Sequence, residues 1–246
     1  MRGLWGVTAA CLFAGLVGCS NDGSTKPKSN HPPEAPVSEL SGFTPNVEAI
    51  VGMAPDLVVA SDAPEEVVEG LAKIDVPLLV LPAAATLEDT YQQLEVLGTA
   101  TGQQGGADKV VTDMRTRIDE IVAGLPDRPT RATYYHELDD TLYTATSKTF
   151  IGGLYALLGL ENIADGASSD GSAYPQLSVE YLVQADPDLI FLADTKCCGQ
   201  SAATVAARPG WSDLRAVRTG SVIALDDDIA SRWGPRVVDQ LEAVAA

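Results

Sequence analysis

The chain alternates between short apolar runs and segments in which apolar residues recur at helical spacing. The apolar runs predict strands at residues 57–60, 77–81, 131–137, 189–193 and 221–225. The segments with helical spacing predict helices at residues 67–73, 87–97 and 150–158. Strands that alternate with helices in this way are typical of α/β folds, so we expect mainly parallel sheets.

A repeated unit divides the folded part of the chain. Residues 46–59, NVEAIVGMAPDLVV, match residues 178–191, SVEYLVQADPDLIF. In each copy an Asn or Ser is suited to cap a short helix, and a Glu stands in the first turn, where the helix dipole favours a negative charge. A Pro-Asp pair then ends the helix, and the apolar run behind it predicts a fully buried parallel strand. The two copies indicate two related lobes.

Residues 107–124 lie between the two copies and predict one long helix. One of its faces is apolar, and the opposite face carries acidic and basic residues. At about 1.5 Å per residue this helix is roughly 25 Å long. We expect it to join an N-terminal lobe at residues 38–106 to a C-terminal lobe at residues 125–246. The alternative is an ordinary surface helix inside one domain.

The first 37 residues differ from the rest of the chain. Arg2 precedes an apolar run at residues 4–17, which predicts a secretory signal at residues 1–18 because a membrane-spanning helix needs about 20 apolar residues. Leu16-Val17-Gly18-Cys19 resembles a bacterial lipobox, which implies cleavage before Cys19 and acylation of that cysteine. Residues 19–37 are polar and rich in Ser, Asn, Lys and Pro, so we expect a flexible tether. The alternative is an ordinary signal with a chance cysteine.

Composition and charge narrow the class of protein. The chain has 246 residues with 46% hydrophobic content, which predicts a globular protein with one sizeable or two small cores. A net charge of −18 argues against nucleic acid or an anionic bilayer surface as the partner. Cys197 and Cys198 are adjacent and lack the spacing of a zinc site. They form either a vicinal disulfide or a reduced pair in a partly buried loop.

The sequence contains no catalytic constellation. It has no glycine-rich phosphate loop or nucleophile elbow, and His136 is the one histidine of the globular part. A metal cage made of protein side chains alone is therefore poorly supported, and we expect neither enzymatic activity nor a resident cofactor. The rival hypothesis is an exported hydrolase in which Glu137, Asp139 and Asp140 supply an acid and a base.

Several motifs occur in an order that resembles one known family. These are LSGFTPNVE at residues 40–48, PDLVV at 55–59, FIGGL at 150–154, LGLENI at 158–163 and PDLIF at 187–191. They are similar to the iron-siderophore and cobalamin class of periplasmic binding proteins, and the similarity runs from residue 38 to the C-terminus. The resemblance implies two α/β lobes joined by a rigid helix, as in class III periplasmic binding proteins.

The same resemblance implies a function. We expect a lipid-anchored, extracytoplasmic solute-binding protein of an ABC importer that takes a ferric siderophore or a related metal chelate between its lobes. It would deliver this ligand to the membrane subunits of the permease, as a monomer. Receptors for cobalamin, haem or a metal ion, and a decayed receptor that no longer transports, are the alternatives.

One departure from the family concerns the N-terminal lobe. In the family a strand, a helix and a second strand precede the segment that resembles residues 40–43, and here the tether leads into it directly. We therefore expect a truncated N-terminal lobe whose sheet exposes an edge and part of an apolar face. Three alternatives remain open: a partner covers that face, the lobe is rearranged, or the protein is defective.

Ligand-binding residues are expected at the carboxyl ends of the strands, where α/β folds place their ligands. Trp233 and Tyr174 offer flat aromatic surfaces, and the forked donors of Arg232 suit carboxylate, hydroxamate or catecholate oxygens. The alternatives place Trp233 in the core and pair Arg232 with an aspartate. Because Tyr134 and Tyr135 alternate faces along their strand, we expect one of them in the core.

Further candidates complete the predicted site. Asp62 follows a first-lobe strand, and His136 either contacts ligand or bonds to backbone. Phe43 is added because it matches the family segment that rims the cleft. Glu65 and Glu66 resemble the glutamate with which such receptors dock to permease arginines; the alternative is a charged helix start. The matching stretch of the second lobe, residues 195–211, has no acidic residue, so docking through two symmetric glutamates is not expected.

Overall fold

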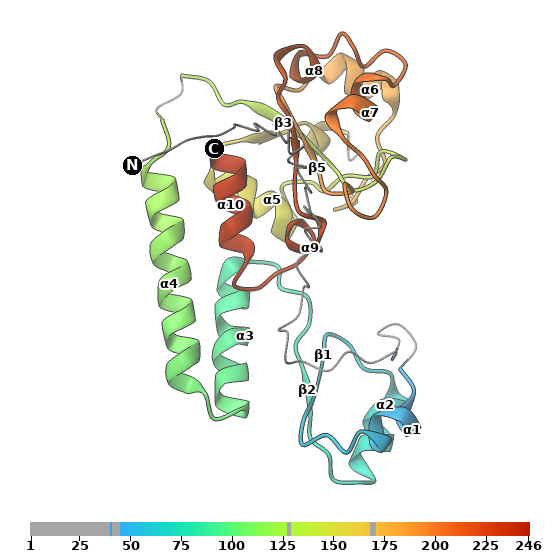
Figure 1. Ribbon diagram of the computed structural model, residues 1–246, viewed down its shortest axis with the longest axis vertical. Helices are drawn as coiled ribbons and strands as arrows, with labels where there is room; N and C mark the ends of the chain where they lie inside the picture. Colours follow the sequence, from blue (N-terminus) through green and yellow to red (C-terminus); the bar gives the residue numbers. More distant parts are fainter. Residues whose placement is uncertain (1–39, 41–44, 127–128, 168–170) are drawn as a thin grey trace, which may run out of the picture. The chain divides into compact units, whose positions relative to one another are not determined.

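The computed structural model describes residues 40, 45–126, 129–167 and 171–246, and these residues form an α/β fold (Figure 1). Their strands make two parallel sheets. In the first sheet β1 (Val58–Ala60) pairs with β2 (Leu78–Val80), and the second sheet has the strand order β4-β3-β5-β6. The expected parallel arrangement is confirmed. No helix in the described part of the chain combines the length and the apolar character needed to cross a membrane.

The first copy of the repeated unit supplies α1 (Val47–Gly52) and leads into β1 of the first sheet. Asn46 caps α1 by accepting a hydrogen bond from the N–H of Ala49 at 2.9 Å. α2 (Glu65–Ala72) follows β1 and packs on α1.

Contrary to the prediction, β1 is not fully buried, because Val59 is 47% exposed. The physical reason is that few apolar side chains cover this sheet. Between residues 45 and 81 the buried side chains are Val67 and Leu71 of α2. Val80 of β2 is exposed as well.

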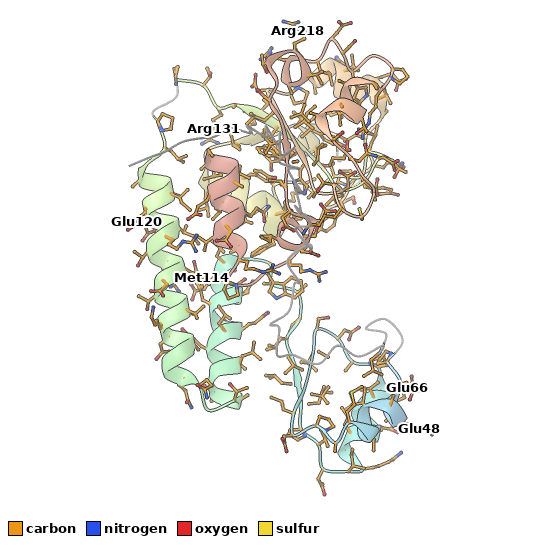
Figure 2. All side chains as sticks on the ribbon, viewed as in Figure 1. Glu48, Glu66, Met114, Glu120, Arg131 and Arg218 are labelled. Atoms are coloured by element: carbon orange, nitrogen blue, oxygen red, sulfur yellow. The ribbon has the colours of Figure 1, made fainter. Side chains whose placement is uncertain are left out.

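Two long helices follow the first sheet. α3 (Leu87–Ala100) begins with a capping box, in which Thr86 and Asp89 bond to each other's backbone N–H. α4 (Gln104–Ala123) covers most of the predicted long helix and packs along both α3 and α10 (Val237–Ala245) (Figure 1). Figure 2 shows Met114 on the side of α4 that faces these helices, whereas Glu120 points away. The predicted apolar face of this helix is confirmed.

The second sheet contains the larger core. β3 (Thr133–Glu137) lies between β4 (Glu161–Asn162) and β5 (Leu189–Leu192), and β5 pairs on its other side with β6 (Val222–Ala224). The remaining connections are α5 (Phe150–Leu157), η1 (Ile163–Gly166), α6 (Val179–Ala185), α7 (Ala202–Ala206), α8 (Arg215–Thr219) and α9 (Asp227–Ala230).

Both faces of this sheet are covered. Tyr134 packs with Phe191 and residues of α5 and α9, whereas Tyr135 packs on the other face with Leu182 of α6 and Trp211. Both tyrosines are therefore buried, and the expectation that only one lies in the core is wrong. Alternation along a strand separates core from solvent only where one face is open.

The second copy of the repeated unit folds as predicted. Ser178 caps α6 by accepting a hydrogen bond from the N–H of Tyr181 at 3.1 Å. Asp186 ends the helix in a left-handed conformation, with φ at 42°, and β5 follows as a strand buried over most of its length. The two copies thus share a helix-turn-strand unit but differ in burial.

Candidate functional site

A groove of about 360 Å³ opens beside the carboxyl ends of β1 and β2. Its walls come from the residues that end or follow these strands, from one side of α3, and from the segment between α9 and α10. Most of the lining is apolar: Val59, Ala60, Leu81, Leu94, Leu97, Trp233 and Pro235. The polar part comes from Ser61, Thr90 and Gln93, and we call this site the Trp233 groove.

Trp233 is oriented by a single polar contact. Its indole Nε1–H donates a hydrogen bond to Oε1 of Gln93 on α3, at 2.9 Å. Gly234 follows with φ at 150°, a conformation that side-chain-bearing residues rarely adopt, so the chain turns directly after the indole. The ring is half-buried and lines the groove. The expectation that Trp233 belongs to the ligand site stays a prediction, but its position suits that role.

A smaller cavity of about 170 Å³ adjoins the groove and shares Trp233 with it. Arg232 and Asp228 also line this cavity. Within the described residues Arg232 forms no ion pair, and Asp228 pairs with Lys196 at 3.0 Å. The exposed guanidinium of Arg232 is therefore available to an anionic group beside the indole.

Other predicted site residues lie outside these two cavities. Asp62 is exposed, follows β1, and accepts a hydrogen bond from the N–H of Ala63 at 2.8 Å. Tyr174 is 49% exposed on the segment before α6. Neither residue lines the Trp233 groove or its neighbour. Phe43 lies outside the described residues.

His136 is fully buried in β3. Its Nδ1 lies 2.8 Å from the hydroxyl of Tyr155, a side-chain partner and not the backbone partner expected as the alternative. Burial lowers the pKa of His136 to about 4, so the imidazole is neutral at physiological pH. The structure does not bring His136 to the Trp233 groove, and contact with a ligand there requires a rearrangement.

A charged cluster that sequence reasoning missed lies at the carboxyl end of the second sheet. Glu137 is completely buried and forms a two-pronged ion pair with Arg208, with N···O distances of 2.5 and 2.6 Å. The guanidinium also stacks on the ring of Trp211 at 4.6 Å. Sequence alone gives no signal for this pair, because its members are 71 positions apart.

Asp194 is buried beside this pair. Burial, together with the nearby charge of Glu137, raises the pKa of Asp194 to about 7. Neither of its carboxyl oxygens has a hydrogen-bond partner among the described residues. A negative charge on Asp194 is costly here, because the carboxyl is buried close to the charge of Glu137, so the protonated form of Asp194 is favoured.

These contacts remove the acid and base that the hydrolase hypothesis requires. Glu137 is engaged by Arg208, and Asp139 accepts hydrogen bonds from the N–H and the hydroxyl of Thr141 in a tight turn. Asp140 is exposed on the same turn. No group of three or more His, Cys, Asp or Glu side chains in the described segments is placed to hold a metal ion.

Glu65 and Glu66 stand in the first turn of α2 and are exposed. Figure 2 shows Glu66 of α2 near Glu48 of α1, the helix on which α2 packs. The position is compatible with both sequence-based alternatives, a docking surface and a charged helix start.

The second sheet also borders a larger cavity, of about 520 Å³, at its opposite end. Arg131 before β3 and Leu189 at the start of β5 line it, together with the end of α10. Parallel sheets bind ligands at the carboxyl ends of their strands, so the Trp233 groove is the better candidate site.

Comparison with known proteins gives an independent result. The family described as "Periplasmic binding protein" matches residues 9–229. An uncharacterized ABC transporter substrate-binding lipoprotein of Bacillus subtilis is 27% identical, over 85% of this chain and 67% of its own length. A cobalamin-binding protein of Halobacterium salinarum is 31% identical, over 84% of this chain and 57% of its own length. The chain thus spans between half and about two thirds of these relatives.

Solved structures share the fold. A possible iron-binding (periplasmic solute-binding) protein from Staphylococcus epidermidis superimposes with a TM-score of 0.71 and 22% identity, over 84% of this chain and 81% of that one. A periplasmic haem-binding protein from Roseiflexus gives a TM-score of 0.70 and 22% identity, over 82% and 79% of the two chains. The expected α/β fold of this structural class, with its long helix, is confirmed.

Proposed function

The chain belongs to the periplasmic binding protein family, and from this premise we propose that it is the extracytoplasmic solute-binding lipoprotein of an ABC importer. Members of this family bind solutes and are not enzymes, in agreement with the expectation from the sequence. In this proposal the protein captures a ferric siderophore or a related metal chelate and delivers it to the permease. Affinity comes from a largely preformed site, which needs little rearrangement to bind.

The observation that carries the proposal is that Trp233 lines the Trp233 groove and, together with Arg232, lines the small cavity that adjoins it. The indole offers an apolar face held by Gln93, and the guanidinium beside it is exposed and free of ion pairs within the described residues. A metal chelate presents the matching surfaces, because an organic skeleton surrounds anionic oxygen ligands. Arg232 would bind those oxygens while the skeleton packs on Trp233.

A second candidate ligand is a tetrapyrrole, namely cobalamin or haem. The predominantly apolar lining of the groove favours a flat macrocycle. Relatives named "Cobalamin-binding protein" and "Fe(3+)-citrate-binding protein" match this chain with 31% and 24% identity. Their names support testing both ligand classes together.

The test is a panel of titrations with a ferric siderophore, ferric citrate, cyanocobalamin and haemin. We expect one of them to bind saturably in calorimetry and to quench tryptophan emission. Of the two tryptophans in the described residues, Trp211 is buried and Trp233 is not, so a Trp233→Phe variant that still binds should lose most of the quenching. If no chelate binds the wild-type protein, the proposal fails. Quenching that persists in the variant would move the ligand away from the groove.

The lipid anchor and the docking surface are further parts of the proposal. A Cys19→Ser variant should move from the membrane to the soluble fraction, and unchanged retention without lipid on the N-terminal peptide would contradict the anchor. A Glu65→Gln/Glu66→Gln variant should weaken uptake while leaving ligand affinity intact, because exposed carboxylates pair with arginines across interfaces. If uptake is unaffected, these residues are merely helix-start charges.

A further inference from the structure

The small cavity beside Trp233 is bordered by two basic side chains. Arg232 and Arg236 both line it, and both are exposed. Neither forms an ion pair with another described residue. In a chain with a net charge of −18, an anion needs such a local concentration of positive charge in order to bind. Two guanidinium groups without acidic partners provide it.

One carboxylate lines the same cavity. Asp228 belongs to α9 and stands four positions before Arg232, a spacing at which side chains on a helical turn are neighbours. The turn extends beyond the end of α9, because the N–H of Arg232 donates to the carbonyl oxygen of Ile229 at 3.3 Å. A free Asp228 would therefore compete with an anionic ligand for the guanidinium of Arg232.

Lys196 engages this carboxylate. Its ammonium donates to Asp228 at 3.0 Å and to Asp226 at 2.6 Å. Lys196 lies on the loop between β5 and α7, and Asp227 holds that loop by accepting the N–H groups of Thr195 and Lys196 at 2.9 and 2.8 Å. Because these two bonds come from the backbone, the loop should keep its place when the side chain of Lys196 is replaced.

We propose that Lys196 is a positioning residue that holds Asp228 away from Arg232 and so leaves the small cavity to an anionic group of the ligand. This inference rests on the proposed function, and it narrows the ligand class to chelates that expose anionic oxygens. Lys196 does not touch the ligand in this role. Direct attraction between its ammonium and the ligand is the alternative, and it predicts a different pattern of rescue.

The variants separate the two roles. Lys196→Gln removes the ammonium and frees Asp228. Two double variants restore the wild-type net charge: Lys196→Gln/Asp228→Asn removes the competing carboxylate, whereas Lys196→Gln/Asp226→Asn keeps it, because Asp226 does not line the cavity. Asn at position 226 retains an oxygen that can cap α9, as Asp226 does by accepting the N–H of Asp228 at 3.0 Å. Lys196→Arg keeps the charge and should behave as the wild type.

Phenylglyoxal tests the role of Lys196 without any ligand, because it modifies free arginines faster than paired ones. Peptide mass spectrometry follows the rate at Arg232. We expect Lys196→Gln to slow it about three-fold, as an exposed ion pair at this spacing allows. The Asp228→Asn double variant should restore the rate, and the Asp226→Asn one should not. The protein is kept reduced, because Cys197 and Cys198 are exposed free thiols and not the disulfide or partly buried pair expected as alternatives.

Calorimetry with two probes tests the ligand class. The affinity for ferric citrate, which is anionic, should follow the reactivity of Arg232 across the variants, whereas that for cyanocobalamin, which has no net charge, should not change. An unchanged rate at Arg232 in folded Lys196→Gln, or equal rates in the two double variants, would overturn the role of Lys196. A wild type that prefers cyanocobalamin to ferric citrate would overturn the anionic ligand class. A wild type that binds no chelate contradicts the proposed function, and the phenylglyoxal rates still decide the role of Lys196.

Discussion

The indole of Trp233 is the one aromatic side chain that lines the groove, and the hydrogen bond to Gln93 orients it. Trp233→Ala should lower the affinity for the ligand identified in the panel by about ten-fold or more, because aromatic anchors contribute about 2 kcal/mol at such positions. Trp233→Phe keeps a flat ring without the N–H donor and should lose less. Calorimetry measures both, and equal affinity in a folded Trp233→Ala variant would contradict this prediction.

A second prediction at the scale of single residues concerns Asp194 and the pH dependence of stability. Its pKa is about 7 in the folded chain, against 3.8 ordinarily. Between these pH values the folded chain holds a proton that the unfolded chain has released, so its stabilising contribution is lost as the pH rises towards 7. Asp194→Asn removes the titratable charge and keeps a side chain of nearly the same shape. We expect the variant to match the wild type near pH 4 and to exceed it by about 2 kcal/mol at pH 8.

The measurement is the free energy of unfolding in urea for both proteins at several pH values. His136 has the opposite sign, because its pKa falls from 6.5 to about 4 on folding and its stabilising contribution is lost as the pH falls through that window. In the wild type the two slopes partly cancel. In Asp194→Asn the slope of His136 should remain, so stability should rise with pH. A stability difference that is independent of pH would contradict the raised pKa of Asp194.

At the scale of elements, the start of α5 depends on a glycine. A Cβ on Gly152 would lie 2.5 Å from Cα of Ser147 and would also collide with the carbonyl oxygen of Thr146. Gly153 is the matched control, because a Cβ there meets nothing within 4 Å. Gly152→Ala should cost about 1–3 kcal/mol. Gly153→Ala should stabilise by about 0.5–1 kcal/mol, as in other exposed helix positions. Equal unfolding midpoints in urea would contradict the close packing.

Most of the helices and strands could be predicted from the sequence. The repeated unit, the long helix and five of the six described strands follow from local apolar spacing and capping residues, and they fold where expected. The two-residue strand β4 was not predicted. Short helices such as α7 and α9 were not predicted, because four or five residues carry too little periodicity.

The site was predictable only in part for a different reason. Trp233 stood out as an aromatic residue in a terminal loop, whereas its partner Gln93 lies 140 positions away. Such a pair is created by tertiary packing and leaves no local pattern. The buried pair of Glu137 and Arg208 escaped prediction in the same way.

At the scale of the whole described chain, burial is distributed unevenly. The three apolar clusters of the core involve α3, α4, α10 and the second sheet with its helices. The first sheet contributes to none of them, and its strands keep exposed valines. Local opening costs the least free energy where few apolar contacts are lost. The pair of strands β1 and β2 should therefore open more readily than β3 and β5.

Native-state hydrogen exchange tests this difference and its link to ligand binding. Without ligand, the amide of Leu81, bonded to Ala60 at 2.8 Å, should exchange faster than that of Ala193, bonded to Glu137 at 3.0 Å. Both Leu81 and Ala60 line the Trp233 groove. A ligand that binds the groove only while β1 and β2 remain paired should therefore slow exchange at Leu81. Ala193 lies in an apolar cluster of the second sheet, away from the groove, and serves as the internal reference. Saturating ligand that leaves exchange at Leu81 unchanged, in a protein shown by calorimetry to bind, would exclude the Trp233 groove as the binding site.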